Sequence, residues 1–216
     1  MFSFNVQCAM ASTTNDSLVD QPDFSEPWKF SDVVLVVEDQ KFHVHRSTLS
    51  IWSPVFETMF TSQFKEKNMY EIPLPGKKAS EIKELLLIIY PTVSETGWNT
   101  VTKENCYFLG ELAEEYQMDA IMQRCENFLV EEVSRTYGNT VLAHLTFAQT
   151  HKLEKLIKTI IDKASRLRMA DFRSHELYDK MDQHIYKQIV EGMVRRHEDG
   201  RSLCWECRSN SKSFYD

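Results

Sequence analysis

The sequence predicts an α+β fold, in which a small β-sheet flanked by helices is followed by an all-helical part. Residues 33–37 are five consecutive β-favouring apolar residues, and residues 41–45 then alternate between apolar and polar. All six prolines lie at or before Pro91. Because proline breaks helix interiors, the rest of the chain is free to be helical. Residues 153–167 carry apolar side chains at i, i+3, i+4 and i+7, as one face of a helix requires.

The front of the chain reads as a hairpin followed by two helices and a further strand. Residues 33–37 and 41–45 form the hairpin across a polar turn. Ser53-Pro54 predicts a helix start, because serine caps helices and proline suits the first helical position. Residues 69–74 form a strand with Tyr70, Ile72 and Leu74 on one face, and residues 80–90 form a helix.

Pro73 limits where the strand at residues 69–74 can lie. Proline has no backbone N–H to donate to a neighbouring strand. We therefore expect this strand either at an edge of the sheet or with Pro73 meeting the neighbouring strand on its other side.

The back of the chain reads as successive helices. Thr102 and Asp119 are candidate caps of two helices joined by Gln117-Met118, and so short a link makes the pair antiparallel. After a break at Gly138-Asn139, helices are expected at residues 140–150 and 152–167, from Ser174 to Met181, and after Asp182. The predicted division is an arm at 1–27, one domain at 28–135, a helical extension at 139–196 and a polar tail at 197–216.

Composition limits the function classes. The formal net charge is −7 at pH 7, which disfavours binding to nucleic acid. No run reaches the roughly 18 apolar residues of a membrane span, and the first ten residues lack the features of a signal peptide. We expect no membrane partner and a cytoplasmic or nuclear location, with the five cysteines reduced.

No pattern in the sequence indicates catalysis. The Gly-rich phosphate loops, the HExxH zinc motif and the GxSxG nucleophile motif are all missing from the sequence. Cys106 and Cys125 fall on apolar helix faces and read as core residues rather than nucleophiles. We expect the protein to be no enzyme and to need no cofactor.

The pair Cys204-Trp205-Glu206-Cys207 has the spacing of metal ligands. One such pair supplies two of the four ligands that zinc needs, and His197 and His184 are the candidate third and fourth. Two reduced surface thiols are the favoured interpretation, because a second ligand pair is missing from the sequence.

Several segments together resemble the BTB/POZ domain. They are Phe30–Val37, Phe42–Arg46, Ser53–Phe56 and Met59-Phe60. Residues 109–129 are similar to the closing helix pair of that domain, so the resemblance spans residues 28–133. Residues 139–195 resemble the start of the BACK helical extension that follows many BTB domains.

The resemblance implies a protein–protein interaction module that is not an enzyme. Many BTB proteins form homodimers, and many bind a cullin-3 ubiquitin-ligase scaffold as substrate adaptors. In that subset a hydrophobic-x-Glu motif follows the helix that here carries Met59-Phe60, and Phe64-Lys65-Glu66 stands at the matching place. The helices around Tyr107 and Tyr116 would complete the cullin surface. The alternative is an oligomerisation or scaffold protein with no ubiquitin-ligase role.

Two further sets of residues follow from the resemblance. The arm carries few apolar residues and Pro22, so dimerisation would use Leu49, Ile51 and Trp52 of the first helix instead. Asp32 and Arg46 match a charged pair near the family's dimer interface. A local ion pair or helix cap is the favoured interpretation, because buried charges need partners whether or not they bind another protein.

Overall fold

The structure is a computed structural model, and it describes residues 24–27, 30–63, 65–90 and 100–198. The described part contains a three-stranded sheet: β1 (Val33–Val37), β2 (Gln40–Val44) and β3 (Glu71–Pro73). The strand order is β2-β1-β3, with β1 antiparallel to β2 and parallel to β3. The predicted α+β class and the predicted hairpin are confirmed.

Pro73 lies on the edge strand β3, as predicted, and stands opposite Val36 of β1. The ladder continues past the proline because the backbone N–H of Leu74 donates to the carbonyl of Val36 at 2.9 Å. Ile72 and Leu74 are buried, but Tyr70 is 53% exposed. Tyr70 precedes β3, which begins at Glu71, and its side chain is not buried with those of Ile72 and Leu74, although its carbonyl still accepts the Val34 N–H at 2.9 Å.

Four helical segments surround the sheet: α1 (Arg46–Trp52), α2 (Pro54–Thr61), the 3₁₀ turn η1 (Lys65–Asn68) and α3 (Ala79–Ile89). Ser53 is the predicted cap of α2, and its Oγ accepts a hydrogen bond from the Phe56 N–H at 3.1 Å. The same fully buried hydroxyl donates to the carbonyl of Tyr116 at 2.6 Å. Ser53 therefore both starts a helix and ties it to a distant segment.

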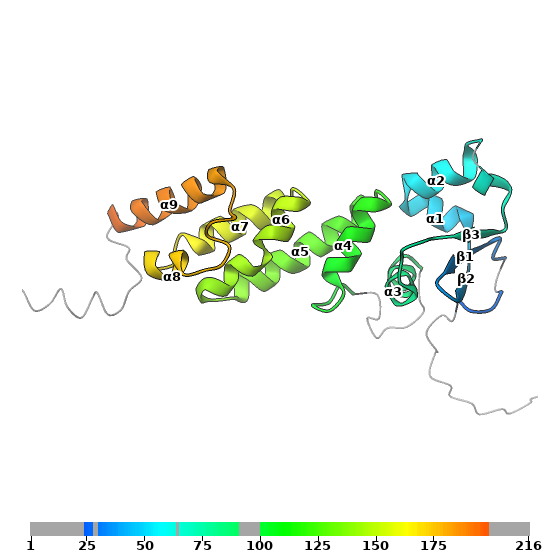
Figure 1. The fold of residues 1–216 in the computed structure, drawn as a ribbon, viewed down its shortest axis with the longest axis horizontal. Coiled ribbons are helices and arrows are strands. Elements are labelled where there is room, and N and C mark those ends of the chain that lie inside the picture. Colours follow the sequence, from blue (N-terminus) through cyan, green and yellow to red (C-terminus); the bar gives the residue numbers. More distant parts are fainter. Residues whose placement is uncertain (1–23, 28–29, 64, 91–99, 199–216) are drawn as a thin grey trace, which may run out of the picture.

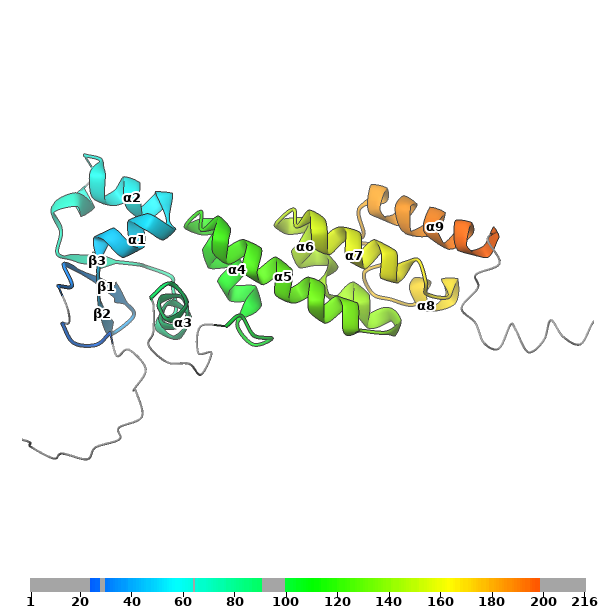
Figure 2. The same cartoon turned by 180° about the vertical axis from the view of Figure 1, so that it is seen from behind.

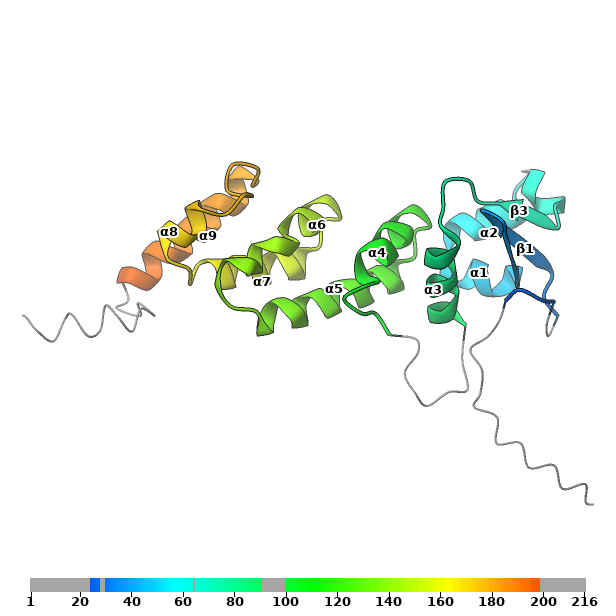
Figure 3. The ribbon, with the colours of Figure 1, turned by 60° about the horizontal axis from the view of Figure 1, so that its bottom comes forward.

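The closing helix pair is α4 (Cys106–Glu115) and α5 (Asp119–Arg135). Gln117 makes the tight connection with a positive φ of 52°. The helix caps are Asn105 and Met118, so the predicted caps Thr102 and Asp119 are each misplaced. Figures 1 and 3 place α3 between α4 on one side and the sheet with α1 and α2 on the other.

The extension contains η2 (Gly138–His144), α6 (Leu145–Thr150), α7 (Glu154–Ala164), α8 (Met169–Arg173) and α9 (Gln183–Glu198). The helix predicted at residues 140–150 is thus divided into a 3₁₀ segment and a short α-helix. Residues 174–181 form turns rather than the predicted helix. The Asp182 cap is confirmed, since its Oδ1 accepts from the His184 N–H at 2.7 Å.

Two hydrophobic cores lie along the elongated molecule, with the sheet at one end and α9 at the other (Figures 1 and 2). Ile121 and Cys125, in the first half of α5, belong to the core around the sheet. Leu129 and Val133, in its second half, belong to the core of the extension. Helix α5 therefore joins the two cores. In the part of the chain that the structure describes, no helix has the length and apolar character needed to cross a membrane.

Phe24 belongs to the folded domain rather than to the predicted arm at residues 1–27. Its side chain is fully buried, and its ring meets Tyr90 edge-on at 5.2 Å between centroids. Its carbonyl accepts from the His43 N–H at 2.7 Å, along the outer edge of β2. The rest of the predicted arm before Phe24 lies outside the described residues.

Candidate protein-interaction surfaces

Asp32 and Arg46 act separately rather than as an ion pair. The Asp32 Oδ1 accepts the backbone N–H of Arg46 at 2.8 Å, which caps the start of α1. The Arg46 Nη2 instead donates to the carbonyl of Met69 at 2.5 Å, and its guanidinium lies 4.7 Å from the centre of the Phe60 ring. The structure supports the local cap interpretation for Asp32. Arg46 links α1 and α2 to the segment that follows η1.

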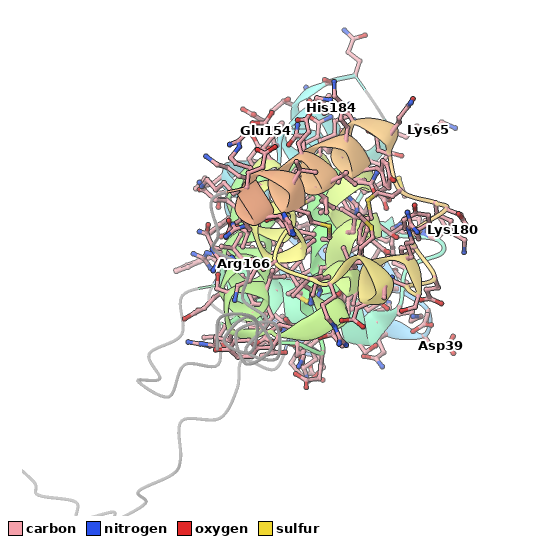
Figure 4. All side chains as sticks on the ribbon, turned by 90° about the vertical axis from the view of Figure 1, so that its left-hand side faces the viewer. Asp39, Lys65, Glu154, Arg166, Lys180 and His184 are labelled. Atoms are coloured by element: carbon pink, nitrogen blue, oxygen red, sulfur yellow. The ribbon has the colours of Figure 1, made fainter. Side chains whose placement is uncertain are left out.

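That segment forms an exposed surface beside α2, here called the η1 surface and made of Lys65, Glu66, Met69 and Tyr70. Met69 is 38% exposed and Tyr70 is 53% exposed. Among the described residues, the side chains of Lys65 and Glu66 make no hydrogen bond or ion pair. Figure 4, a view along the long axis, shows Lys65 at the outer edge of the molecule. The surface thus offers apolar and charged groups together.

The five residues predicted for cullin binding do not form one surface in the structure. Phe64 lies outside the described residues. Tyr116 is buried, with its ring stacked 4.7 Å from that of Phe56, and burial raises the pKa of its phenol. Tyr116 is therefore a core residue that supports α2 from inside. Only Lys65 and Glu66 lie on an exposed segment together.

Tyr107 contacts the helical extension. Its hydroxyl lies 2.6 Å from the His144 Nδ1, and its ring meets Phe147 edge-on at 5.0 Å between centroids. Gly110, on the same helix, allows the Phe147 ring to pack closely against α4, since a Cβ at that glycine would lie 2.5 Å from the Phe147 Cζ. The Glu114 carboxylate also pairs with the His151 Nδ1 at 2.6 Å. One face of α4 is thus a contact between the two parts of the chain.

The residues predicted for a dimer interface differ in exposure. Ile51 is 83% exposed, whereas Leu49 is buried at 1% in the first core. Leu49 cannot contribute a surface contact, because it points into the core from the inner side of α1. Trp52 is partly buried, and the Arg124 guanidinium lies 5.4 Å from the centre of its ring. Ile51 and Trp52 remain the exposed part of this prediction.

An open groove runs between the ends of α1 and α3 and the outer side of α5, with a volume of about 880 Å³. Trp52, Tyr90, Val101 and Phe128 supply apolar lining. Arg124 and Glu131 supply the charges. Glu131 is paired with Arg135 at 2.6 Å, while Arg124 forms no ion pair with any described residue. Among the described lining residues, the unpaired charge is therefore positive.

The cysteine and histidine predictions have mixed outcomes. Cys106 and Cys125 are buried, and burial raises the pKa of the Cys125 thiol to about 12. Both lie in the core, as predicted.

Cys204 and Cys207 lie outside the described residues. His184 and His197 stand at opposite ends of α9, about 20 Å apart at the rise of an α-helix, so they cannot bind one zinc ion together.

Three surface residues escaped the sequence-based predictions. The sequence predicts a strand at Met69 and Tyr70 and gives no role to Arg124. Tyr70 lies four positions after Glu66 of the predicted hydrophobic-x-Glu motif. This proximity is the one sequence signal that could have indicated that Tyr70 is part of an exposed surface. Nothing in the sequence places Arg124 over Trp52, because 72 positions separate them.

Comparison with known proteins agrees with this architecture. BTB and MATH domain-containing protein 38 of Caenorhabditis elegans is 36% identical over 99 residues, covering 46% of this chain and 24% of that protein. BTB and MATH domain-containing protein 36 of the same organism is 27% identical over 178 residues, covering 82% and 53%. Human Kelch-like protein 24 is 28% identical over 163 residues, covering 74% and 25%. The chain thus spans between about a quarter and about half of the length of these relatives.

Among solved structures, the BTB domain of human gigaxonin matches with a TM-score of 0.38 and 20% identity, covering 46% of this chain and 77% of that one. The family model of the BTB/POZ domain matches residues 22–133, which are 112 of the 216 residues. The match includes Phe24, in agreement with its burial. The chain therefore belongs to the BTB/POZ family, a family of protein-interaction modules.

Proposed function

We propose that this protein is an adaptor that docks a cullin-3 ubiquitin-ligase scaffold through the η1 surface. The observation that carries the proposal is the Glu66 carboxylate, which has no partner among the described residues and lies on the 3₁₀ turn that follows α2. This is the place at which the hydrophobic-x-Glu motif stands in BTB proteins that bind cullin-3. The similarity to Kelch-like and BTB-MATH proteins supports an adaptor role.

The chemistry of the η1 surface suits a protein partner. Tyr70 offers a large amphipathic ring, the kind of side chain that anchors many protein interfaces. The Glu66 carboxylate can accept charge-assisted hydrogen bonds from backbone N–H groups or basic side chains. Arg46 holds the segment in place through the Met69 carbonyl, so its backbone is ordered before binding.

Binding of the purified full chain to the N-terminal domain of cullin-3, measured by calorimetry, tests this proposal. We expect the double variant Glu66→Ala, Tyr70→Ala to weaken binding at least tenfold. Glu176→Ala, which removes an exposed carboxylate in the extension, is the matched control and should bind like wild type. If wild type does not bind, or if the double variant binds equally well, the proposal is wrong.

The second candidate is an oligomerisation or scaffold protein, and the exposure of Ile51 favours it. An apolar side chain that is 83% exposed beside Trp52 is a natural centre for a contact between copies. Light scattering of the full chain should then give twice the monomer mass, and Ile51→Asp should give the monomer mass. Val194→Asp, on the exposed side of α9, is the control. A wild-type dimer that does not bind cullin-3 would favour this second candidate.

A further inference from the structure

The groove between α1, α3 and α5 has a feature that the proposed function does not use. It combines apolar lining from Trp52, Tyr90 and Phe128 with one cation, Arg124, that has no carboxylate partner among the described residues. An apolar groove with one unpaired charge fits a segment that carries apolar side chains next to an acidic one. The occupant should therefore be acidic and amphipathic.

The chain itself supplies such a segment next to the groove. Phe24 is anchored by its carbonyl on β2 and by its ring against Tyr90, and Tyr90 lines the groove. Phe24, the first described residue, therefore lies beside the groove. Leu18 and Val19 lie six and five positions before Phe24, a reach of about 20 Å when extended, which is enough to cross a groove of this size.

The charge of this segment also matches. Residues 1–23 contain three aspartates, Asp16, Asp20 and Asp23, and no lysine, arginine or glutamate. Asp16 and Asp20 flank Leu18 and Val19, so an apolar pair sits between two carboxylates. In the groove, the one carboxylate, Glu131, is already paired with Arg135. Among the described residues no carboxylate pairs with Arg124, so an aspartate of the acidic segment would meet an opposite charge there.

We infer that residues 16–20 bind in this groove of the same molecule, with Leu18 and Val19 on the apolar lining and an adjacent aspartate paired with Arg124. In this arrangement the bound residues 16–20 cover Trp52 at the end of α1. A protein partner that needs the exposed face of α1 would compete with this segment. This inference does not depend on cullin binding.

Hydrogen–deuterium exchange on the full-length chain tests the inference. Leu18→Ser with Val19→Ser should increase amide exchange several-fold in peptides that cover residues 49–54 and 121–131. The matched control, Phe2→Ser with Phe4→Ser, removes two apolar residues from the same arm and should leave those peptides unchanged. Equal behaviour of the two double variants in these peptides would overturn the inference.

Photo-crosslinking separates binding within one molecule from binding between two. A benzophenone amino acid at position 18 should crosslink to residues 124–131 or to Trp52. In a mixture of ¹⁵N-labelled and unlabelled protein, every crosslinked peptide pair should carry a single isotope. Arg124→Glu should lower the yield several-fold, and Lys155→Glu, the same charge change on the exposed side of α7, should not. Mixed-isotope pairs, or crosslinks confined to other parts of the chain, would contradict the inference.

Discussion

The two cores of this protein are held together by different means. In the first core, segments distant in sequence are joined by buried or partly buried polar links, such as the Ser53 hydroxyl to the Tyr116 carbonyl and the His45 N–H to the Tyr90 hydroxyl. In the second core, apolar helix stripes pack on one another, and several polar links are ion pairs nearer the surface. Asp162, for example, pairs with Arg166 and Arg196 at 2.7 Å each.

This difference follows from the sheet. Strands β1 and β3 are neighbours in space but belong to distant parts of the sequence, so specific contacts must set their register. Helices form their hydrogen bonds locally and need only an apolar stripe to pack. We therefore expect substitutions of single polar side chains to lower the stability of the first core. The stability of the second core should depend mainly on the volume of its apolar side chains. Four predictions test this contrast, from the largest expected effect to the smallest.

Phe56→Ala should lower the free energy of unfolding by about 3–5 kcal/mol, since it removes a fully buried ring from the stack with Tyr116 and Phe60. Phe172→Ala should cost a similar amount in the second core. Chemical denaturation gives the size of each effect, and hydrogen exchange gives its location. If either variant loosens both cores equally, α5 couples them into one cooperative unit and the contrast fails.

Ser53→Ala should cost about 2 kcal/mol. The change removes the cap of α2 and leaves the carbonyl of Tyr116 buried without its donor. The matched change in the second core is Ser165→Ala, which removes a buried hydroxyl at the end of α7 that donates to the Asp162 carbonyl and accepts from the Arg196 Nε at 3.1 Å. Denaturation midpoints of the two variants should differ, with Ser53→Ala the lower. Equal midpoints would mean that the buried hydrogen bonds of the first core contribute no more to stability than those of the second core.

Gly110→Ala tests the contact between the two parts of the chain and should cost about 1–2 kcal/mol. Alanine favours helices by up to about 1 kcal/mol over glycine, so packing alone must account for any loss. The new methyl group would overlap the Phe147 ring, which would have to move. Phe147→Leu should restore part of the stability in the double variant. A stabilised Gly110→Ala protein would show that α6 adjusts freely against α4.

The smallest effect concerns pH at the same contact. Burial lowers the pKa of His144, the Glu132 carboxylate opposes this, and Lys103 adds to it. The folded state therefore binds a proton less readily than the unfolded state, whose histidine titrates near pH 6.5. The neutral His144 imidazole therefore makes its full contribution to the free energy of unfolding above that pH, and this contribution declines as the pH falls below it. Thermal melts between about pH 7.5 and pH 5 should show a smaller decline for His144→Gln than for wild type.

The sequence-based predictions succeeded where the signal was local. The hairpin, the Ser53-Pro54 helix start, the edge position of Pro73 and the Asp182 cap each depend on a few adjacent residues, and all are present. Errors arose where a local pattern competed with packing. The resemblance placed Tyr116 and Leu49 at binding surfaces, but neighbouring helices cover both side chains. The helix predicted from Ser174 to Met181 is absent, and residues 174–181 form turns instead.

The sequence by itself determined the α+β class, the family and the existence of a second helical part, because periodicity, proline positions and the BTB motif residues are all readable along the chain. Only the tertiary structure decided which of those residues face outward. Arg46 reaches Met69, Tyr107 reaches His144 and Arg124 covers Trp52, all across long sequence separations. A surface is the product of such distant contacts, since each side chain is exposed or buried by whatever segment packs against it.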